Sequence, residues 1–353
     1  MKNVAIIIGN FSHGNGTERA VTNLASSLCA YGDYSVKIIS CETNNDAVPY
    51  FKIDKDVKIY HLNLSLAKKS NYLKIARKIN SLCKDEIIDF LLGTTHALNS
   101  IMVLINLPNL KKIACEHMNY AAAPFYSRIV RRFAYPKLDA VVLLTNADAA
   151  HYTFIDKKKK FIIPNSVTIH NESSDCKNKV MLAVGRYTYQ KGFDMLIYAF
   201  YLAHLECPDW KLRIVGGGED EELLKVKIAE YKLENSVELV PFTKNIQAEY
   251  LNAGMYVLSS RFEGFVLVLV EAKDAGLPTV AFNCPEGPAD IVCDGKDGFL
   301  VKPNNIAEFA NRMTELAKDE SLRKKFGAYG KKDVKRLSPE AVFKMWDKLL
   351  GEL

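Results

Sequence analysis

Short runs of apolar residues alternate with longer mixed segments along the whole chain. Six runs lie in the first half, at residues 4–8, 36–40, 89–93, 112–115, 140–144 and 161–165. After a polar stretch at 170–179 the rhythm restarts, with runs at 181–185, 211–216, 237–241, 255–260 and 278–282. Apolar runs separated by helix-length segments are typical of parallel strands that are covered on both faces. The pattern therefore predicts two consecutive α/β sheets, each doubly wound.

These two series predict the domain organisation, because 353 residues are too many for one typical core. We expect an N-terminal Rossmann-like domain at 1–169, a linker at 170–179 and a C-terminal Rossmann-like domain at 180–336. Residues 337–353 should form a helix that packs back on a domain, the N-terminal one being a candidate. Ser338 and Pro339 suit its N-cap and first turn. Its apolar face would consist of Val342, Phe343, Trp346, Leu349 and Leu350.

The composition is that of an ordinary globular protein, with 48% hydrophobic and 25% charged residues. Eight cysteines without a C-x-x-C pair indicate buried thiols of a reducing compartment, not a disulfide framework or a zinc site. The apolar start, Val4–Ile8, is too short for a signal peptide. The apolar stretch at 87–107 is interrupted by Asp89, His96 and Asn99, which argues against a membrane span. We expect a cytoplasmic location.

The net charge of +6 hides an asymmetry between the halves of the chain. Residues 1–170 contain 22 Lys and Arg against 13 Asp and Glu, whereas the remainder contains 25 against 28. A basic first half is compatible with nucleic acid, an anionic lipid surface or a phosphorylated acceptor as a partner.

Two acids, Glu263 and Glu271, close off the segment EGFVLVLVEA at 263–272. Carboxylates are rarely placed within apolar segments unless a partner satisfies them. The hydroxyl groups of a sugar and of a ribose are suitable partners. Two ordinary acids on a solvated helix face are the alternative, and this motif alone does not decide between them.

Cations and glycines follow two strands of the second half. In VGRYTYQKG (184–192), a turn at Gly185 is followed by Arg186 and Lys191, which together suit a diphosphate. A pair of exposed surface cations is the alternative. In IVGGGED (214–220), Gly216 and Gly218 would permit close approach of a base or phosphate.

The first half offers two weaker signals. Gly14 and Gly16 expose backbone N–H groups near a helix start, which suits an anion site, although a structural turn is as good an interpretation. The dinucleotide fingerprint does not fit, since Arg19 occupies the third glycine position. His117 follows a strand and could hydrogen-bond a sugar hydroxyl or phosphate, as an imidazole that titrates near neutral pH. A structural histidine is the alternative.

The order of these motifs resembles family-4 retaining glycosyltransferases of the GT-B fold. The resemblance rests on G-x-G-T-E-R at 14–19, C-E-H at 115–117, V-G-R…K-G at 184–192, E-G-F…E-A at 263–272 and C-P-x-G-P at 284–288. It spans nearly the whole chain and is nearest to the bacterial branch that builds O-antigen, capsule or other exopolysaccharide repeats. It implies two Rossmann-like domains that face an interdomain cleft.

The resemblance also implies roles for individual residues. Arg186 and Lys191 would hold the donor diphosphate and stabilise the departing nucleotide. Glu263 would bind hydroxyls of the donor sugar, and Glu271 those of the ribose. His117 would lie beside the transferring sugar, so the catalytic set would be His117, Arg186, Lys191 and Glu263. The donor cradle would be completed by Gly14, Gly16, Gly185, Gly216, Gly218, Gly264, Phe265 and Val266. Two departures from the family pattern are Tyr187-Thr188-Tyr189 and Asn15.

The implied reaction is retaining transfer of a hexose or N-acetylhexosamine, from a UDP-sugar in preference to GDP-mannose, to a lipid-diphosphate-linked saccharide. No cofactor, metal or nucleic acid is expected, and Asp54-Lys55-Asp56 is interpreted as a solvated turn before a strand. A nucleotide-sugar epimerase and a non-enzymatic membrane- or nucleic-acid-binding scaffold are the rival hypotheses.

Basic residues near apolar ones suggest peripheral binding to the inner face of the cytoplasmic membrane or to a lipid diphosphate. A solvated helix face is the alternative interpretation. The residues concerned are Lys74, Arg77, Lys78, Arg128, Arg131 and Arg132.

Overall fold

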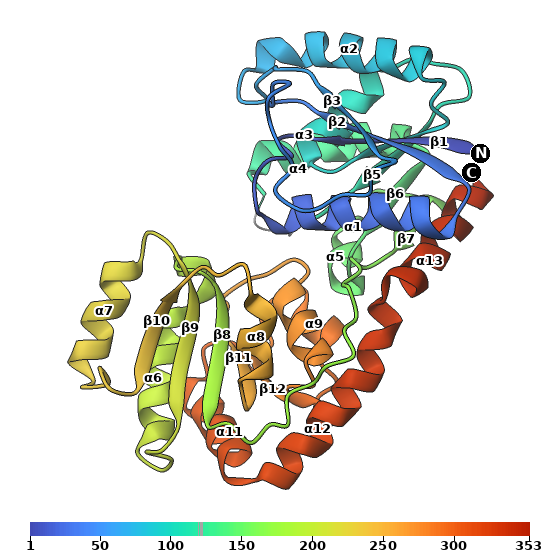
Figure 1. Cartoon of the computed structure of the whole chain (residues 1–353). Coiled ribbons are helices and arrows are strands. Elements are labelled where there is room, and N and C mark those ends of the chain that lie inside the picture. The colour runs from blue at the N-terminus through green and yellow to red at the C-terminus, as the bar shows by residue number, and fades with distance from the viewer. Residues whose placement is uncertain (119, 121–122) are drawn as a thin grey trace. The chain divides into compact units, whose positions relative to one another are not determined.

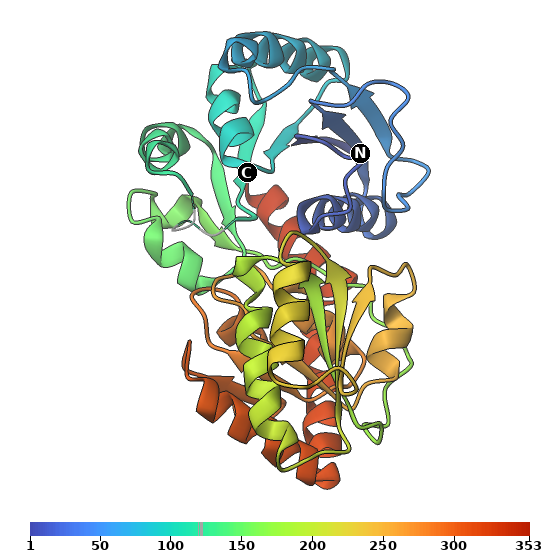
Figure 2. The ribbon, with the colours of Figure 1, turned by 90° about the vertical axis from the view of Figure 1, so that its left-hand side faces the viewer.

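The computed structural model describes residues 1–118, 120 and 123–353. The chain divides into two compact units. Unit 1 comprises Met1–Thr168 together with Leu337–Leu353, and unit 2 comprises Ile169–Arg336 (Figure 1). Both chain ends therefore belong to unit 1 (Figure 2). The division falls beside the boundaries that the sequence pattern predicts, and the C-terminal segment returns to the N-terminal unit.

Unit 1 contains a parallel sheet in the order β3-β2-β1-β4-β5-β6-β7 among the described residues. Its strands are β1 (Lys2–Ile8), β2 (Tyr34–Ser40), β3 (Lys58–His61), β4 (Phe90–Gly93), β5 (Lys111–Cys115), β6 (Ala140–Leu143) and β7 (Lys160–Ile162). Successive side chains of a strand point to opposite faces, and in β1 both sets are apolar and buried. Helices must therefore pack on both faces of the sheet.

Helices of unit 1 pack on both faces of this sheet. Val4 and Ile6 belong to the core cluster that includes α1 (Gly16–Tyr31) and α13 (Pro339–Glu352). Ala5 and Ile7 belong to the cluster that includes α2 (Tyr72–Asp85) and α3 (His96–Ile101). Figure 1 shows α1 and α2 on opposite sides of the sheet. The remaining α-helices of the unit are α4 (Phe125–Ala134) and α5 (Asn146–His151).

Helix α13 has the start and the buried face that its sequence predicts. The Ser338 hydroxyl accepts a hydrogen bond from the Ala341 N–H at 3.2 Å, and Pro339 lies in the first turn. The five apolar residues of the expected face are all buried. They pack beside α1, so the C-terminal segment completes the core of unit 1.

Unit 2 contains a second parallel sheet, in the order β10-β9-β8-β11-β12-β13 among its strands. The strands are β8 (Val180–Arg186), β9 (Lys211–Gly217), β10 (Val237–Pro241), β11 (Met255–Leu258), β12 (Thr279–Phe282) and β13 (Gly298–Val301). The helices are α6 (Phe193–His204), α7 (Glu221–Glu230), α8 (Ile246–Leu251), α9 (Leu267–Asp274), α10 (Pro288–Ile291), α11 (Ile306–Lys318) and α12 (Glu320–Asp333).

The segment 170–179, expected to be a linker, is packed into unit 2 instead. The Ser174 hydroxyl donates to the Ala253 carbonyl at 2.6 Å, and Cys176 is buried. The His170 ring contacts Asp274 at 2.7 Å. Seven of the ten residues are exposed, so the segment runs along the surface of unit 2 and is held there by these contacts.

The strand order of unit 2 reverses between β8 and β11. From β8 the chain proceeds to β9 and β10 on one side, whereas β11, β12 and β13 lie on the other. In open parallel sheets ligands bind beyond the carboxyl ends of the strands at such a reversal. The loops after β8 and β11 are therefore where a site is to be sought.

Candidate functional site

An ion pair joins the loops that follow β8 and β11. The ammonium of Lys191 donates to Oε1 of Glu263 at 2.7 Å. Both side chains are largely shielded from solvent, with 16% of Lys191 and 8% of Glu263 exposed. The structure therefore brings together two of the four residues of the expected catalytic set, 72 positions apart in the sequence.

The Glu263 carboxylate has further partners. The Ser260 hydroxyl donates to its Oε1 at 2.6 Å, and the Gln190 amide reaches its Oε2 at 3.5 Å. Neither Ser260 nor Gln190 was predicted, since nothing in the sequence marks a serine or glutamine that will meet a particular acid. These donors fix the position of the carboxylate, whose oxygens are acceptors of the kind that the hydroxyls of a sugar require.

Two glycines make the Lys191–Glu263 contact sterically feasible. A Cβ atom on Gly185 would lie 2.9 Å from Cε of Lys191, so the lysine stem crosses the strand end where only glycine fits. Gly192 has φ +63°, in the left-handed region, and a Cβ there would lie 2.3 Å from the Ser259 carbonyl oxygen. Gly185 was expected to take part in donor binding, and its observed contact explains how it positions Lys191.

A second ion pair links the loop that carries Glu263 to the first turn of α6, which directly follows the loop that carries Lys191. Arg261 donates through both terminal nitrogens to the Asp194 carboxylate, at 2.9 and 2.6 Å. Its guanidinium also stacks on Tyr189, 4.0 Å from the ring centroid, and donates to the Tyr189 carbonyl at 2.7 Å. This bidentate contact holds the loop that carries Lys191 against the loop that carries Glu263.

The Gly-rich loop after β9 lies beside Arg186, the last residue of β8. Arg186 is exposed and pairs in register with Gly217. Cβ atoms on Gly216 and Gly218 would clash with the backbone of Gly185 and Tyr187, whereas one on Gly217 would meet nothing within 4 Å. The two predicted glycines therefore allow close packing of the loops, and Gly217, which was not singled out, lines the open side.

Glu271 lies on α9 and is buried, as is Glu263. The Tyr250 hydroxyl donates to its Oε2 at 2.9 Å. The alternative of two solvated surface acids is therefore wrong, because both carboxylates are buried and bonded. Glu263 lies in the loop before α9 and Glu271 on the helix itself, and their roles in donor binding stay predictions.

The segment 264–266 leads into α9 and supports a neighbouring loop. Gly287 has φ +97°, and a Cβ atom there would lie 2.6 Å from the Gly264 carbonyl oxygen. Val266 is buried and precedes the first residue of α9. The C-P-x-G-P loop therefore packs directly on the E-G-F segment. Donor binding by the N–H groups of Phe265 and Val266 stays a prediction.

In unit 1, the loop with Gly14 and Gly16 follows β1 and leads directly into α1. The buried Glu18 lies in the first turn of that helix, and burial raises the pKa of its carboxyl. A ligand phosphate at this helix end would face that acid as well as the N–H groups. The ring of Tyr50 lies against Gly14, where a Cβ atom would be 2.8 Å from it.

His117 follows β5, and Nδ1 of its ring is buried with no hydrogen-bond partner among the described residues. Burial lowers the pKa of its imidazole to about 4. The expectation that His117 titrates near neutral pH is therefore wrong, because the charged ring would lose its hydration. At pH 7 the ring is neutral and serves as a hydrogen-bonding group.

The basic residues expected on one surface fall into two groups. Lys74, Arg77 and Lys78 of α2 and Arg132 of α4 are exposed, and Arg128 is partly exposed. Arg131 is fully buried and pairs with Glu116, so its expected place on a lipid-facing surface is wrong. The helical periodicity of α4 alone could not show which side of the helix faces inward.

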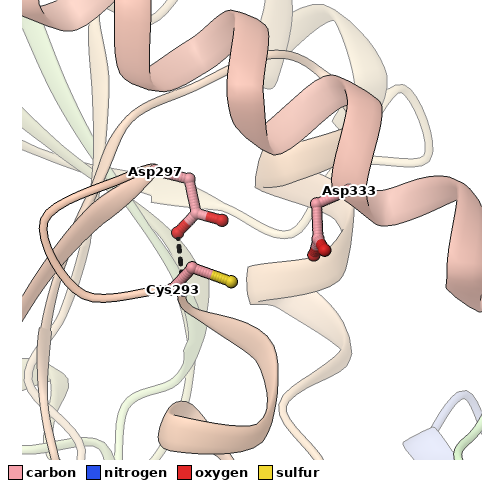
Figure 3. Close-up of side chains that lie close together, drawn as sticks. All are labelled: Cys293, Asp297 and Asp333. Atoms are coloured by element: carbon pink, nitrogen blue, oxygen red, sulfur yellow. Dashed lines mark hydrogen bonds between the residues drawn. The ribbon is translucent and has the colours of Figure 1, made fainter.

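Cys293, Asp297 and Asp333 form a group with the atoms for metal coordination among the described residues (Figure 3). The buried ammonium of Lys273 lies 2.8 Å from Asp297 and 2.7 Å from Asp333. A divalent cation would have to displace this lysine, which already neutralises the carboxylates. The group is therefore explained as a structural ion-pair cluster.

Comparison with solved structures identifies the fold. The pneumococcal O-GlcNAc transferase GtfA, solved in complex with UDP and GlcNAc, matches with a TM-score of 0.82 at 13% identity over 99% of both chains. Two parallel Rossmann-like sheets with such neighbours define the GT-B fold of glycosyltransferases.

Sequence comparison identifies the family. A model described as glycosyl transferases group 1 matches residues 165–333. An uncharacterized glycosyltransferase of Haemophilus influenzae is 34% identical over 330 residues, which are 91% of this chain and 92% of that protein. The amylovoran biosynthesis glycosyltransferase AmsD of Erwinia amylovora is 30% identical over 99% of this chain and 100% of its own. The chain belongs to the glycosyl transferases group 1 family and is a glycosyltransferase.

A further relative from Campylobacter jejuni is 27% identical over 100% of this chain and 99% of its own. It is an α-1,4-N-acetyl-D-galactosaminyltransferase that acts on an undecaprenol-diphosphate-linked GalNAc-containing saccharide.

Proposed function

We propose that this glycosyltransferase moves a hexose or N-acetylhexosamine from a UDP-sugar to a lipid-diphosphate-linked saccharide in bacterial surface polysaccharide synthesis. The anomeric configuration would be retained, and no metal would be required. The observation that carries the proposal is the Lys191–Glu263 ion pair at the strand-order reversal of unit 2, with Arg186 at the adjacent strand end.

The contacts of two acids in unit 2 support recognition of a nucleotide sugar. Glu263 is held by Lys191 and Ser260 and offers acceptor positions to hydroxyls of the donor sugar. Glu271, held by Tyr250, offers the same to a ribose. Carboxylates accept several hydrogen bonds at once, and charge-assisted bonds of this kind are stronger than neutral ones.

The same loops account for leaving-group stabilisation. The bond between the anomeric carbon and the diphosphate oxygen breaks, the acceptor oxygen bonds to that carbon on the same face, and the departing phosphate takes the acceptor proton. Negative charge then grows on the diphosphate, where the cations of Lys191 and Arg186 would stabilise it. These two side chains would supply the charge that a divalent metal supplies in other transferases.

Relatives and structural neighbours favour the donor and acceptor classes. GtfA was solved with UDP bound, and the Campylobacter jejuni relative acts on an undecaprenol-diphosphate-linked saccharide. AmsD serves amylovoran biosynthesis. GDP-mannose is the competing donor. Backbone groups recognise the nucleobase in such a site, so the identities of the side chains do not reveal which base is bound.

An exposed apolar face on α4 supports peripheral attachment to the inner surface of the cytoplasmic membrane. Five large apolar residues of this helix are exposed, namely Phe125 (71%), Tyr126 (58%), Ile129 (44%), Val130 (45%) and Phe133 (70%). The ammonium of Lys69, near the start of α2, lies 5.3 Å from the Tyr126 ring, so basic α2 adjoins this face. Apolar residues flanked by cations suit an anionic lipid surface. No helix in the described part of the chain is both long and apolar enough to cross a bilayer.

The test is sugar transfer from radiolabelled nucleotide sugars to a lipid-diphosphate-linked acceptor, with and without a chelator. We expect labelled glycolipid from a UDP-sugar at equal rates in both conditions. Glu263→Ala should nearly abolish transfer with the fold intact, whereas Glu234→Ala, an exposed acid of the same unit, should not change it. Strict dependence on Mg²⁺ or Mn²⁺ would refute the metal-free mechanism.

The other hypotheses predict different products. Labelled glycolipid from GDP-mannose alone would make the chain a mannosyltransferase. Release of sugar without glycolipid would indicate an epimerase or a hydrolase. Lipid binding with no turnover of any donor would indicate a scaffold, and the Lys191–Glu263 pair would then be dispensable.

A further inference from the structure

Helix α4 is anchored by an ion pair and not by an apolar stripe. Of its ten residues, all of which the structure describes, Ser127 and Arg131 are the buried ones. The Arg131 guanidinium lies 3.3 Å from the Glu116 carboxylate, and the two side chains are 0% and 1% exposed. A surface helix usually turns its apolar side inward. Here the apolar side is exposed, so the position of α4 depends largely on Arg131.

The Glu116 carboxylate is the centre of a buried polar network. The Tyr135 hydroxyl and the Asn99 amide both donate to its Oε1, the latter at 2.9 Å. Asn99 also bonds to the Cys115 carbonyl at 3.3 Å, and Arg131 donates to the Tyr152 hydroxyl at 3.1 Å. The network thus joins α3, β5, α4 and the residues after α4 and α5.

Glu116 also precedes His117 directly in the chain. The His117 ring has its Nδ1 buried without a hydrogen-bond partner among the described residues, so that nitrogen has no bond that orients the ring. Its backbone, in contrast, adjoins Glu116, whose carboxylate is bonded to Tyr135, Asn99 and Arg131. The placement of His117 therefore follows from the placement of Glu116.

Stability alone does not require such a pair. Removing two charges from water is costly, and replacing a buried ion pair by apolar side chains of similar size is often neutral or stabilising. Removing one partner is different, because it leaves an uncompensated buried charge. The hydrogen bonds from Tyr135 and Asn99 to Glu116, and from Arg131 to Tyr152, hold the two side chains in a geometry that an apolar replacement would not reproduce.

We propose that Glu116 and Arg131 are positioning residues that hold the exposed face of α4 and His117 in a fixed relation. An acceptor lipid that docks on α4 would thereby be presented to the sugar beside His117. This inference rests on the proposed function, because it assigns α4 to the acceptor and His117 to the transferring sugar. It gives the buried ion pair a role in the rate of transfer.

The test compares single and double variants of the pair. Glu116→Leu and Arg131→Met should each lower the melting temperature, since each leaves one buried charge. The double variant Glu116→Leu/Arg131→Met should recover a melting temperature near that of the wild type. Its kcat for transfer should nevertheless stay at least tenfold reduced, with UDP binding in unit 2 unchanged. Lys157→Met removes an exposed cation of unit 1 that lies outside α2 and α4; it is the control and should keep the wild-type kcat.

A second readout follows the His117 ring itself. In the wild type its imidazole should titrate far below the ordinary range in a histidine-labelled NMR experiment, with the signal assigned by its loss in His117→Gln. In the double variant this titration should shift upward as the ring becomes less confined. A purely structural pair would leave the titration unchanged once stability is recovered.

Should the double variant fail to fold, Tyr152→Phe replaces it, because this change removes one hydroxyl bonded to Arg131 and leaves both charges in place. We expect a several-fold loss of kcat. A stable double variant or Tyr152→Phe with wild-type kcat would overturn the inference. Absence of sugar transfer by the wild type would instead refute the proposed function, so the two failures are distinguishable.

Discussion

Replacing Glu263 by glutamine is the sharpest perturbation of the donor site. The amide keeps the size of the side chain and one acceptor oxygen, and it removes the negative charge beside Lys191. Hydrogen bonds to charged groups contribute about 1.5–3 kcal/mol each. If one such bond to the donor sugar is lost in the transition state, kcat/KM should fall roughly 10- to 150-fold, at about 1.4 kcal/mol per factor of ten.

The stability change should be smaller. The Ser260 hydroxyl can still donate to the amide oxygen, and Lys191 is 16% exposed, so water partly compensates for its lost counter-ion. We expect a loss of about 1–2 kcal/mol in the free energy of unfolding, measured by urea denaturation. The fold would survive while most of the activity would not.

The matched control is Glu249→Gln, which weakens an ion pair elsewhere in unit 2. Glu249 bonds Arg213 at 2.6 and 3.1 Å and is 18% exposed. This control should lose similar stability and keep its activity. The reasoning is refuted if Glu263→Gln transfers sugar within threefold of the wild-type kcat/KM, or if Glu249→Gln loses as much activity.

Three other predictions address the cation, the histidine and the exposed helix face. Lys191→Met should lower kcat by roughly 100-fold or more, because it removes the cation that would stabilise the leaving group. Lys191→Arg should not restore kcat, since the side chain crosses Gly185, where the bulkier guanidinium has little room. Initial rates at saturating donor test both variants. The folded-state pKa of His117, about 4, lies below the unfolded value of about 6.5, so the unfolded chain binds more protons between these limits. The free energy of unfolding should therefore fall as the pH drops from about 6.5 to about 4, by up to about 1.4 kcal/mol per pH unit. Denaturation of His117→Gln should show a smaller fall. Equal pH dependence in both proteins would contradict the burial of the His117 ring. The double variant Phe125→Ser/Phe133→Ser should sediment less with phosphatidylglycerol vesicles than the wild type. Neutral phosphatidylcholine vesicles should bind the wild type and the variant weakly. Unchanged sedimentation of the variant would exclude α4 as the lipid-facing surface.

The sequence was informative about the fold where local patterns determine structure. Continuous apolar runs predicted strands such as β1 and β8, because parallel strands are buried on both faces. The Ser338–Pro339 start of α13 was readable because capping is a local interaction. The strand β13, GFLV, was missed, since four residues beginning with glycine carry little strand signal. Element existence is therefore predictable where the pattern is long and uniform.

The candidate site was only partly predictable, because its contacts join distant segments. The motifs marked Lys191 and Glu263, yet their contact depends on the reversal of strand order between β8 and β11. Whether Glu271 is buried depends on Tyr250, which the sequence does not connect with it. Arg131 was misplaced for the same reason, since its partner Glu116 lies on another element. Burial of polar groups is a tertiary property that single-segment patterns do not contain.

The most direct test of the central claim compares wild-type protein with Glu263→Ala. The measurement is the transfer of labelled sugar from a UDP-sugar to a lipid-diphosphate-linked saccharide in the presence of a chelator. The structure predicts rapid formation of labelled glycolipid by the wild type and almost none by the variant, with both proteins equally folded. Equal transfer by the two proteins would contradict a donor site at the Lys191–Glu263 pair.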